Sequence, residues 1–566
     1  MEKEIIRGAE ALMRSLKNEQ VDTIFGYPGG SIMPVFDALY DHKEDFKQIL
    51  VRHEQGAVHA AQGYARSSGK VGVCIVTSGP GATNTLTGIA DAMLDSTPIV
   101  VIAGQVMSSV LGTDFFQEVD LVGVTQPISK WSYQIRSVED IPWAISRAFY
   151  IARTGRPGPV VLDFTKNAQT AKAAYEPAIV DFVRSYVPYH KPDEKAIAEA
   201  AEIINRSARP LVLVGQGVEL GNAHEELKAF IEKGNLPTGR TLLGLSALPS
   251  DHPLNKGMLG MHGNLGPNVN TNNCDVLIAV GMRFSDRVTG ILSTYAKQAK
   301  VIHLDIDPSE INKNVHADIP IVGDCKETLP LITALLKECD RKEWLDTFEE
   351  YEKIEEEKVV RPALTPDGGP IRMGEVARKV SEATGNSAIL VTDVGQNQMM
   401  SCRYFKFTKP HSLLTSGGLG TMGYGLPAAI GATYGAPDRT VCMFCGDGGF
   451  QMNIQELGTI MEQKRPVKAI ILNNNYLGNV RQWQYMFYNK RYSFTPMVNP
   501  DFELIARGYR IPCRTVVERA DLEGAIQEML STEGPYLLQC AVKAEDDVLP
   551  MIPPGSNIDE MLLEVK

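Results

Sequence analysis

Residues 440–475 read TVCMFCGDGGFQMNIQELGTIMEQKRPVKAIILNNN, and they decide the fold of the last part of the chain. The apolar run VCMFC leads into GDGG (446–449), and a second apolar run, VKAIIL, ends in NNN (473–475). Runs of this kind, separated by a helix-length segment, are typical of parallel strands joined by a crossover. The carboxyl ends of parallel strands meet at one edge of a sheet, so we expect Asp447 and Asn474 to project oxygens into one crevice.

A carboxylate, an amide oxygen and glycine N–H groups at a strand end suit Mg²⁺ bridging to a diphosphate. Taken singly, GDG is an ordinary strand-to-helix turn and NNN an ordinary loop. The two motifs follow successive strands, which makes an accidental pairing much less plausible.

The same β-α alternation runs through the whole chain and predicts parallel sheets wrapped by helices. Expected strands are 72–78, 98–104, 210–217, 275–281, 300–307, 388–395 and 467–475. Proline-rich or charged segments at about 175–193 and 353–370 are expected to be linkers. The sequence therefore predicts an α/β chain of three doubly wound parallel-sheet domains, at 1–175, 190–350 and 370–542, followed by a C-terminal tail at 543–566 that caps another part of the molecule.

Composition narrows the class of protein. A formal net charge of −12 argues against a nucleic-acid partner, and no apolar run is long enough to cross a bilayer. The first twenty residues are charged throughout and predict an amphipathic helix rather than a signal peptide. Nine scattered cysteines favour a reducing, cytoplasmic location. Cys442 and Cys445 form a C-x-x-C, but residues three apart on a strand point to opposite faces, which favours a structural role over a metal or redox one.

Further motifs carry a resemblance to a known family. The segment RHEQGAVHAAQGYARSSGKVGVCIVTSGPGATN contains Glu54, and FGYPGGSIMPVFDALY, GTDFFQEVD, TGRPGPVVLDFTK, RFSDRVTG, TSGGLGTMGYGLPAAIGA, VRQWQ and VLPMIPPG follow the same pattern. Together with GDGGFQMN they resemble the catalytic subunits of acetohydroxyacid synthases (acetolactate synthases), which are thiamin diphosphate enzymes. The resemblance extends from about Phe25 to about Gly555. It implies that the three domains are, in order, pyrimidine-binding, FAD-type and diphosphate-binding.

The resemblance implies the cofactor sites residue by residue. Glu54 would hydrogen-bond the aminopyrimidine ring of thiamin diphosphate, and Met422 would force the cofactor into its bent form. Mg²⁺ would be held by Asp447, Asn474 and the backbone carbonyl of Tyr476. The other expected thiamin diphosphate residues are Pro28, Val394, Gly395, Gln396, Asn397, Gly420, Gly446, Gly448, Gly449 and Gly478.

It also implies a substrate site for 2-oxo acids, with pyruvate as donor and pyruvate or 2-oxobutyrate as acceptor. Gln117, Phe116, Gly29 and Lys166 would lie near the reacting groups. Arg287 would hold the carboxylate of the second substrate, and Trp483 would shape its side-chain pocket. Without the family pattern, a surface salt bridge for Arg287 and a core position for Trp483 would be preferred.

Whether the middle domain binds FAD is not decided by its local motif, because PLVLVGQGV is only a partial dinucleotide fingerprint. A formal G-x-G-x-x-G at Gly418, Gly420 and Gly423 is discounted because no β-α-β unit is expected to frame it. The resemblance implies an FAD that takes no redox part. Its expected contacts are Gly217, Thr241, Met261, His262, Gly263, Gly281, Arg283, Asp305 and Asp324.

Two residues depart from the family pattern: Asn397 stands where histidine is usual, and Asn479 where methionine is more usual. By resemblance, a homodimer or homotetramer and a separate small regulatory subunit are expected. Three alternatives stay open: a flavin-free catabolic acetolactate synthase, another thiamin enzyme such as pyruvate oxidase, and a catalytically silent protein on the same fold. Intact Glu54, Asp447 and Asn474 speak against the last.

Overall fold

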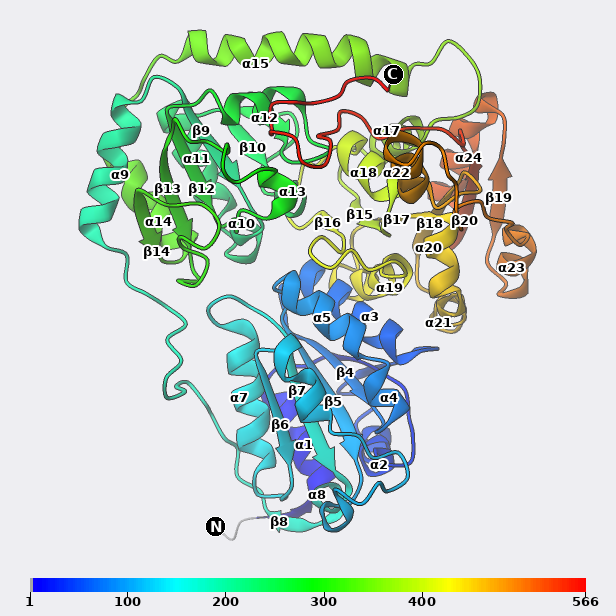
Figure 1. Ribbon diagram of the computed structural model, residues 1–566. Helices are drawn as coiled ribbons and strands as arrows, with labels where there is room; N and C mark the ends of the chain where they lie inside the picture. Colours follow the sequence, from blue (N-terminus) through cyan, green and yellow to red (C-terminus); the bar gives the residue numbers. More distant parts are fainter. Residues whose placement is uncertain (1–3, 566) are drawn as a thin grey trace.

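The computed structural model describes residues 4–565 and contains three six-stranded sheets, one in each part of the chain (Figure 1). All strands within these sheets run parallel, and helices cover both faces. Each sheet has a buried apolar cluster on either side, as a doubly wound fold requires. The predicted fold class is therefore confirmed.

The first sheet has the strand order β3-β2-β4-β5-β7-β6. Its strands are β2 (Thr23–Gly26), β3 (Lys47–Leu50), β4 (Gly72–Val76), β5 (Ile99–Gln105), β6 (Trp131–Ile135) and β7 (Val160–Thr165). Its helices are α1 (Gly8–Asn18), α2 (Met33–Asp41), α3 (Glu54–Ser68), α4 (Pro80–Thr83), α5 (Leu86–Leu94), α6 (Leu121–Thr125), α7 (Ile141–Arg153) and α8 (Lys166–Thr170). A small antiparallel pair, β1 (Ile5–Arg7) with β8 (Lys172–Ala174), closes the domain. The helix expected near the start of the chain is present as α1.

The second sheet has the order β11-β10-β9-β12-β13-β14. Its strands are β9 (Pro210–Val214), β10 (Thr238–Arg240), β11 (Asn255–Met258), β12 (Val276–Val280), β13 (Lys300–Asp305) and β14 (Ile319–Val322). Its helices are α9 (Glu194–Arg206), α10 (Gly217–Leu220), α11 (His224–Gly234), α12 (Leu265–Thr271), α13 (Asp286–Thr289), α14 (Cys325–Leu335) and α15 (Lys342–Glu355).

The third sheet has the order β16-β15-β17-β18-β20-β19. Its strands are β15 (Ile389–Thr392), β16 (Leu413–Leu414), β17 (Val441–Gly446), β18 (Val467–Asn473), β19 (Cys513–Val516) and β20 (Tyr536–Ala541). Its helices are α16 (Arg361–Leu364), α17 (Met373–Ala383), α18 (Gln396–Tyr404), α19 (Gly425–Gly435), α20 (Asp447–Met452), α21 (Leu457–Gln463), α22 (Gly478–Phe487), α23 (Phe502–Gly508) and α24 (Arg519–Ser531). Cys442 and Cys445 lie on opposite faces of this sheet, in separate apolar clusters, which confirms their structural interpretation.

All seven expected strands are present, each ending earlier or at most one residue later than predicted. The prediction of a linker at 353–370 is wrong for most of that range. Helix α15 continues through a π-helical turn (Glu356–Val360) into α16, so irregular chain begins only after Leu364. A run of glutamates and lysines does not distinguish an exposed helix from a linker, and Pro362 stands near the start of α16, where proline is tolerated.

The tail after Val542 crosses from the third domain to the second (Figure 1). Ile552 and Ile558 pack into an apolar cluster of the central domain, and the Ile552 N–H donates to the Met261 carbonyl at 2.8 Å. None of the helices in residues 4–565 combines the length and apolar character that crossing a bilayer needs.

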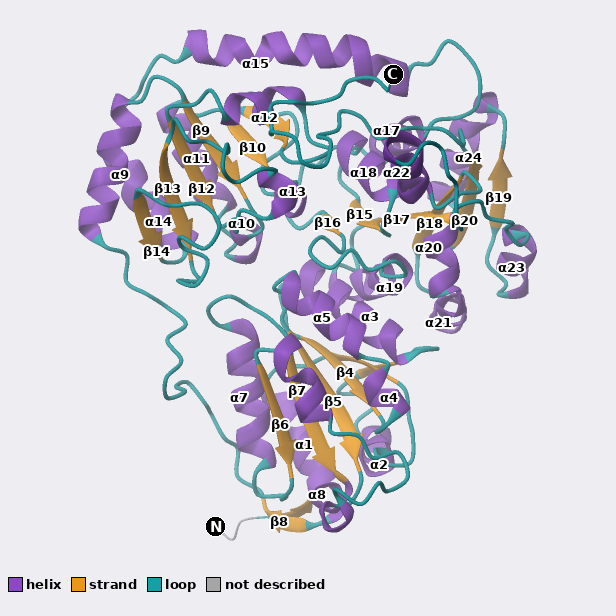
Figure 2. Cartoon of the chain, in the orientation of Figure 1, coloured by secondary structure: helices purple, strands orange, loops and turns teal. Residues whose placement is uncertain are grey.

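Helix α3 of the first domain packs against α19 of the third at very short range. A Cβ on Gly431 would lie 1.8 Å from the Ala60 carbonyl oxygen, and one on Gly63 would lie 2.0 Å from that of Ala428. The contact joins the amino edge of the first sheet to the third domain, since Asp95, just before β5, accepts the Gly417 and Gly418 N–H groups. The arrows of β5 and β7 accordingly point away from the other two domains (Figure 2).

Candidate active site

The third sheet changes direction between β15 and β17, because β16 lies on one side of β15 and the later strands on the other. Crevices outside such switch points are the usual ligand sites of open α/β sheets. The loops after β15 and β17 therefore begin side by side: a Cβ on Gly449 would lie 2.2 Å from Asp393 Oδ1, and one on Gly446 would lie 3.4 Å from Asn397 Nδ2. The sequence expectation that strand ends gather these residues agrees with this geometry.

Asp447 and Asn474 follow adjacent strands, β17 and β18, which pair Gly446 with Leu472. Both side chains are buried. Asp447 Oδ2 accepts a hydrogen bond from Asn499 Nδ2 at 2.6 Å, and burial raises the pKa of the Asp447 carboxyl above its ordinary value. Asn474 donates to Gln396 Oε1 at 3.1 Å and accepts the Tyr476 N–H at 3.1 Å. Carboxylate and amide oxygens so arranged suit a hard divalent cation.

Residues 394–397 form the tight turn that starts α18. Gly395 has φ 127°, a backbone conformation that favours glycine. Asn397 donates to the Val394 carbonyl at 3.1 Å, while its buried Oδ1 has no partner among residues 4–565. Met422 reaches the same crevice, since its Cε lies 3.7 Å from the position of a Cβ on Gly448. Close glycines and a helix start together make a cradle for an anion.

Buried Asp393 holds two of these loops together. Its carboxylate accepts the N–H groups of Val394, Gly423 and Gly425 at 2.8–3.1 Å. The loop 415–424, which contains the formal G-x-G-x-x-G, thereby faces the strand ends. The prediction that no β-α-β unit frames this motif is wrong, because the short β16, α19 and β17 do form such a unit around it. A two-residue edge strand gives too weak a sequence pattern to predict this.

The carboxyl edge of the first sheet gathers a second group of expected residues. Glu54 begins α3, its Oε2 accepts from Asn84 Nδ2 at 3.0 Å, and its Oε1 lies 3.3 Å from the position of a Cβ on Gly81. A Cβ on Gly29 would meet the side chain of Thr77 at 2.5 Å. Pro28, next to Gly29, belongs to the same loop after β2. One carboxylate oxygen of Glu54 is thus held by Asn84, and the other has no hydrogen bond among the described residues.

Gln117, Phe116 and Lys166 lie on the same edge. Gln117 has φ 63° and packs 2.9 Å from the position of a Cβ on Gly79. Lys166 is exposed at the first turn after β7, and Phe116 is 80% exposed. An aromatic ring this exposed indicates a surface that another molecule or subunit covers.

A large cavity of about 1380 Å³ runs between the central and third domains. Every central-domain residue expected at a flavin lines it except Gly263, which lies beside it in sequence. Its floor is a second switch point, between β9 and β12, where a Cβ on Gly217 would lie 2.6 Å from Gly281 Cα. Burial raises the pKa of Asp305, at the end of β13, to about 7.

Arg287, Trp483, Asn479 and Gly420 line the same cavity. The Arg287 side chain is 64% exposed and has only a loose ion pair with Asp286, at 3.8 Å, so its guanidinium can bind a carboxylate. Trp483 stacks edge-on against Phe487, one helical turn away on α22. The cavity thus joins a cationic group to an aromatic wall. Trp483 is half-buried and not a core residue, whereas Arg287 does have the surface ion pair that its alternative described.

Several residues at the carboxyl edges of the first and third sheets were not predicted from the sequence. Asn84 and Asn499 hold Glu54 and Asp447 from distant loops, and no local pattern marks them. Asp393 was not singled out because it lay inside the predicted strand 388–395, whereas β15 ends one residue before it, at Thr392.

Comparison with known proteins agrees with this geometry. Residues 6–124, 197–332 and 393–540 match the N-terminal TPP binding, central and C-terminal TPP binding domains of thiamine pyrophosphate enzymes. The chain is 44% identical to the probable acetolactate synthase large subunit of Methanocaldococcus jannaschii, over 99% of this chain and 96% of that protein. It is 42% identical to the acetolactate synthase isozyme 2 large subunit of Escherichia coli, over 98% and 99% of the two chains. The acetolactate synthase large subunit of Lactococcus lactis is also 42% identical, over 98% and 96%. Because these similarities extend over nearly the whole length, the chain belongs to the acetolactate synthase large subunits of the thiamine pyrophosphate enzyme family.

Proposed function

We propose that this chain is a catalytic acetolactate synthase subunit that decarboxylates pyruvate and transfers the two-carbon unit to a second 2-oxo acid. With pyruvate as acceptor the product is 2-acetolactate, and with 2-oxobutyrate it is 2-aceto-2-hydroxybutyrate, both precursors of branched-chain amino acids. The observation that carries the proposal is the pairing of Asp447 and Asn474 at adjacent strand ends, in a chain of this family.

Thiamin diphosphate, when bound, supplies the carbon nucleophile and the electron sink for this chemistry. The residues after β15, β17 and β18 fit its diphosphate and Mg²⁺. Asp447, Asn474 and the Tyr476 carbonyl would hold the metal ion. The unpartnered Asn397 Oδ1 is an acceptor, and it supports a missing donor or cation at this place.

Glu54 is proposed to hold a proton at the pyrimidine ring nitrogen. Asn84 fixes the carboxylate by one oxygen at 3.0 Å, which leaves Oε1 available for that proton. Gln117 and Lys166, on the same edge, are proposed to orient the substrate carbonyl and carboxylate.

Arg287 and Trp483 are proposed to select the acceptor. The exposed guanidinium binds the acceptor carboxylate, while the indole of Trp483 excludes water and contacts the alkyl group. An ethyl group in place of a methyl gains about 1–3 kcal/mol in an apolar pocket, so the preference for 2-oxobutyrate is finite.

FAD is proposed as a further bound group in the cavity of about 1380 Å³. The close approach of Gly217 to Gly281 leaves no side chain at this switch point, a geometry that lets a bound pyrophosphate come near the backbone.

We propose that the complete site forms between two copies of the chain. Among residues 4–565 no hydrogen bond or ion pair joins Glu54 or Asn84 to Asp447 or Asn474. Both edges also expose large apolar side chains: Met107, Phe115, Phe116, Tyr488, Phe494 and Val498 are at least half exposed. A second copy would cover these patches and bring the two edges together.

The relatives' designation as large subunits supports a separate small regulatory partner. All nine cysteines are free, which agrees with the cytoplasmic location proposed for the enzyme.

The decisive experiment measures CO₂ release and acetolactate formation from pyruvate, with and without 2-oxobutyrate, by the purified protein with thiamin diphosphate, Mg²⁺ and FAD. We expect Glu54→Gln to lower turnover by at least about 100-fold, because a positioned proton donor contributes that much. Calorimetry should show cofactor affinity close to that of the wild type. Glu44→Gln, an exposed glutamate of the same domain, is the matched control.

The alternatives give different results in the same assay. Full activity without any flavin would favour a catabolic acetolactate synthase, and bleaching of the flavin by pyruvate would favour an oxidase. Failure to form acetolactate at all would refute the proposal.

A further inference from the structure

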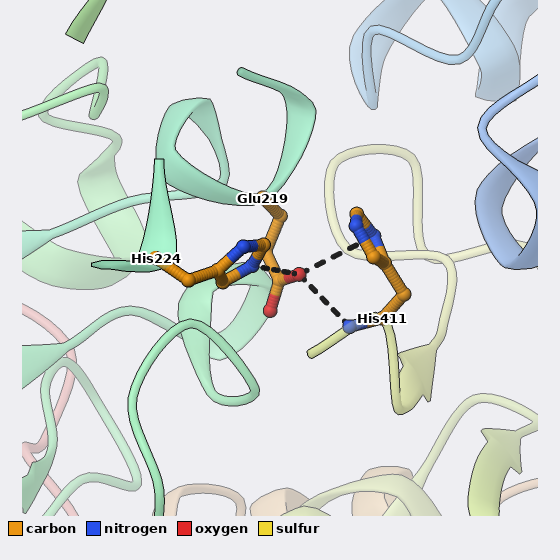
Figure 3. Close-up of side chains that lie close together, drawn as sticks. All are labelled: Glu219, His224 and His411. Carbon is orange, nitrogen blue, oxygen red and sulfur yellow. Dashed lines mark hydrogen bonds and ion pairs between the residues drawn. The ribbon is translucent and has the colours of Figure 1, made fainter. Parts of the chain in front are cut away.

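A compact cluster of ligating side chains lies outside the site described above. Glu219 comes from α10, His224 begins α11, and His411 lies in the loop before β16, so two domains contribute (Figure 3). Their ligating atoms all lie within 4.8 Å of one another. Among residues 4–565 this is the one group of three or more such side chains with that spacing.

The geometry of the cluster matches a metal coordination shell. Glu219 Oε2 lies 3.0 Å from His224 Nε2 and 3.4 Å from His411 Nδ1. Neighbouring ligand atoms about 2.1 Å from a tetrahedral zinc ion are separated by roughly 3.4 Å. The Glu219 carboxylate lies between the two imidazole rings (Figure 3).

Hydrogen-bond partners on the far side of these side chains hold them in orientations that suit metal binding. His411 Nε2 lies 2.8 Å from Asn222 Oδ1, an acceptor, so this nitrogen carries the proton and Nδ1 turns a lone pair toward the carboxylate. Ser246 donates to Glu219 Oε1 at 2.5 Å. Carbonyl and hydroxyl groups behind the ligands are the usual outer partners of metal-bound histidine and carboxylate.

Among residues 4–565 the charged partners of Glu219, which is 6% exposed, are the imidazoles of His224 and His411 and no lysine or arginine. The nearest guanidinium groups are otherwise engaged: Arg240 donates to the Leu245 and Leu248 carbonyls, and Arg439 to the Pro410 and His411 carbonyls. Glu219 Oε2 also accepts the His411 backbone N–H at 3.0 Å. A metal ion between this oxygen and the two imidazoles would supply the positive charge that a buried carboxylate beside neutral imidazoles lacks.

Room for a further ligand exists beside the cluster. Glu219 and His411 line a cavity of about 300 Å³ whose walls also include Asp22 and Arg66 of the first domain and Leu243 of the second. The cavity therefore touches all three domains, and a fourth coordination position could take water or an anion from it.

We propose that Glu219, His224 and His411 bind a divalent transition-metal ion of the zinc class, which ties the central domain to the third domain at their junction with the first. Two imidazoles and one carboxylate select Zn²⁺ or Co²⁺ over Mg²⁺, which prefers oxygen ligands. The site is thus chemically distinct from the Asp447 site.

The test uses the full-length protein stripped with a chelator and resaturated with Mg²⁺, thiamin diphosphate and FAD. Titration with Co²⁺ should give tetrahedral visible absorption bands at one ion per chain, and equimolar Zn²⁺ should abolish them. His224→Gln and His411→Gln should each weaken Co²⁺ binding by more than about tenfold, and Ser246→Ala should weaken it by about 10–100-fold. Zn²⁺ should raise the thermal midpoint of the wild type and leave that of His224→Gln unchanged.

His252→Gln is the matched control, because His252 pairs with Glu232 at 3.1 Å without a third ligand. Its Co²⁺ affinity should equal that of the wild type. Absence of the visible bands in the wild type, or bands of equal affinity in a folded His224→Gln protein, would overturn the proposal.

Discussion

Asp393 is a single buried carboxylate that serves two loops of the diphosphate edge. Its replacement by alanine leaves the N–H groups of Val394, Gly423 and Gly425 without their acceptor. Each unsatisfied buried group costs about 1–3 kcal/mol, so we expect Asp393→Ala to lower the free energy of unfolding by at least about 2 kcal/mol. Urea denaturation measures this. Asp438→Ala, at an exposed aspartate before β17, should change it little. Equal stability of both variants would contradict the role of Asp393.

The buried His59 makes stability depend on pH. Burial lowers its pKa to about 3 from an ordinary 6.5, so the folded protein keeps it neutral while the unfolded chain binds a proton. Its contribution is therefore fully present above pH 6.5 and is lost as the pH falls toward 3. Replacing His59 by glutamine should reduce the loss of stability between pH 7 and pH 5 by about 2 kcal/mol.

His42 offers a test of the opposite sign. Burial alone would lower its pKa, but hydrogen bonds to Asp45 and Glu10 raise it above the ordinary value. Its pairing stabilises the protein most below pH 6.5 and is lost as the pH rises through the folded pKa. His42→Gln should therefore steepen the loss of stability on acidification, whereas His59→Gln should flatten it. Urea denaturation at pH 7 and pH 5 measures the change in unfolding free energy for each variant. A change equal to that of the wild type in both variants would refute this account.

At the scale of elements, the packing of α3 on α19 depends on glycine. A Cβ at Gly431 would meet the Ala60 carbonyl oxygen at 1.8 Å, which the backbone can relieve only by separating the helices. We expect Gly431→Ala to lower the free energy of unfolding by about 1–3 kcal/mol. Gly524→Ala, on α24 with nothing within 4 Å, should instead raise it by up to about 1 kcal/mol. Denaturant titration of the two variants should give opposite signs, and a stabilised Gly431→Ala protein would contradict the close packing.

The sequence predicted elements better than contacts. Strands such as β12 and β18 are continuous apolar runs, because parallel sheets are buried on both faces, and Asp447 and Asn474 were found because they follow such runs. Asn84 and Asn499 were not, since their bonds to Glu54 and Asp447 span 30 and 52 residues. The cluster of Glu219, His224 and His411 was missed for the same reason: His411 lies 192 residues from Glu219.

At the scale of the whole molecule, the orientation of the first sheet decides what one chain can do alone. Its amino edge contacts the third domain through Asp91 and Asp95, where Asp91 accepts from Ser416 and Thr421. The arrows of β5 and β7 point away from the third domain (Figure 2), while the loop after β3 also touches that domain, where Glu456 accepts the Arg52 and His53 N–H groups. In the proposed assembly each chain holds two half-sites, and a pair of chains related by twofold symmetry would complete two sites at once.

This arrangement predicts complementation between two inactive variants. In a mixed dimer of Glu54→Gln and Asp447→Ala chains, one site carries both substitutions and the other carries neither. Coexpression in equal amounts makes half of the dimers mixed, so we expect about a quarter of the wild-type turnover, although each variant alone is nearly inactive. Differently tagged chains allow the mixed dimers to be isolated, and these should reach about half. Isolated mixed dimers without activity would mean that Glu54 and Asp447 of one chain must act together. They would then have to meet within a single chain, against the orientation of the first sheet.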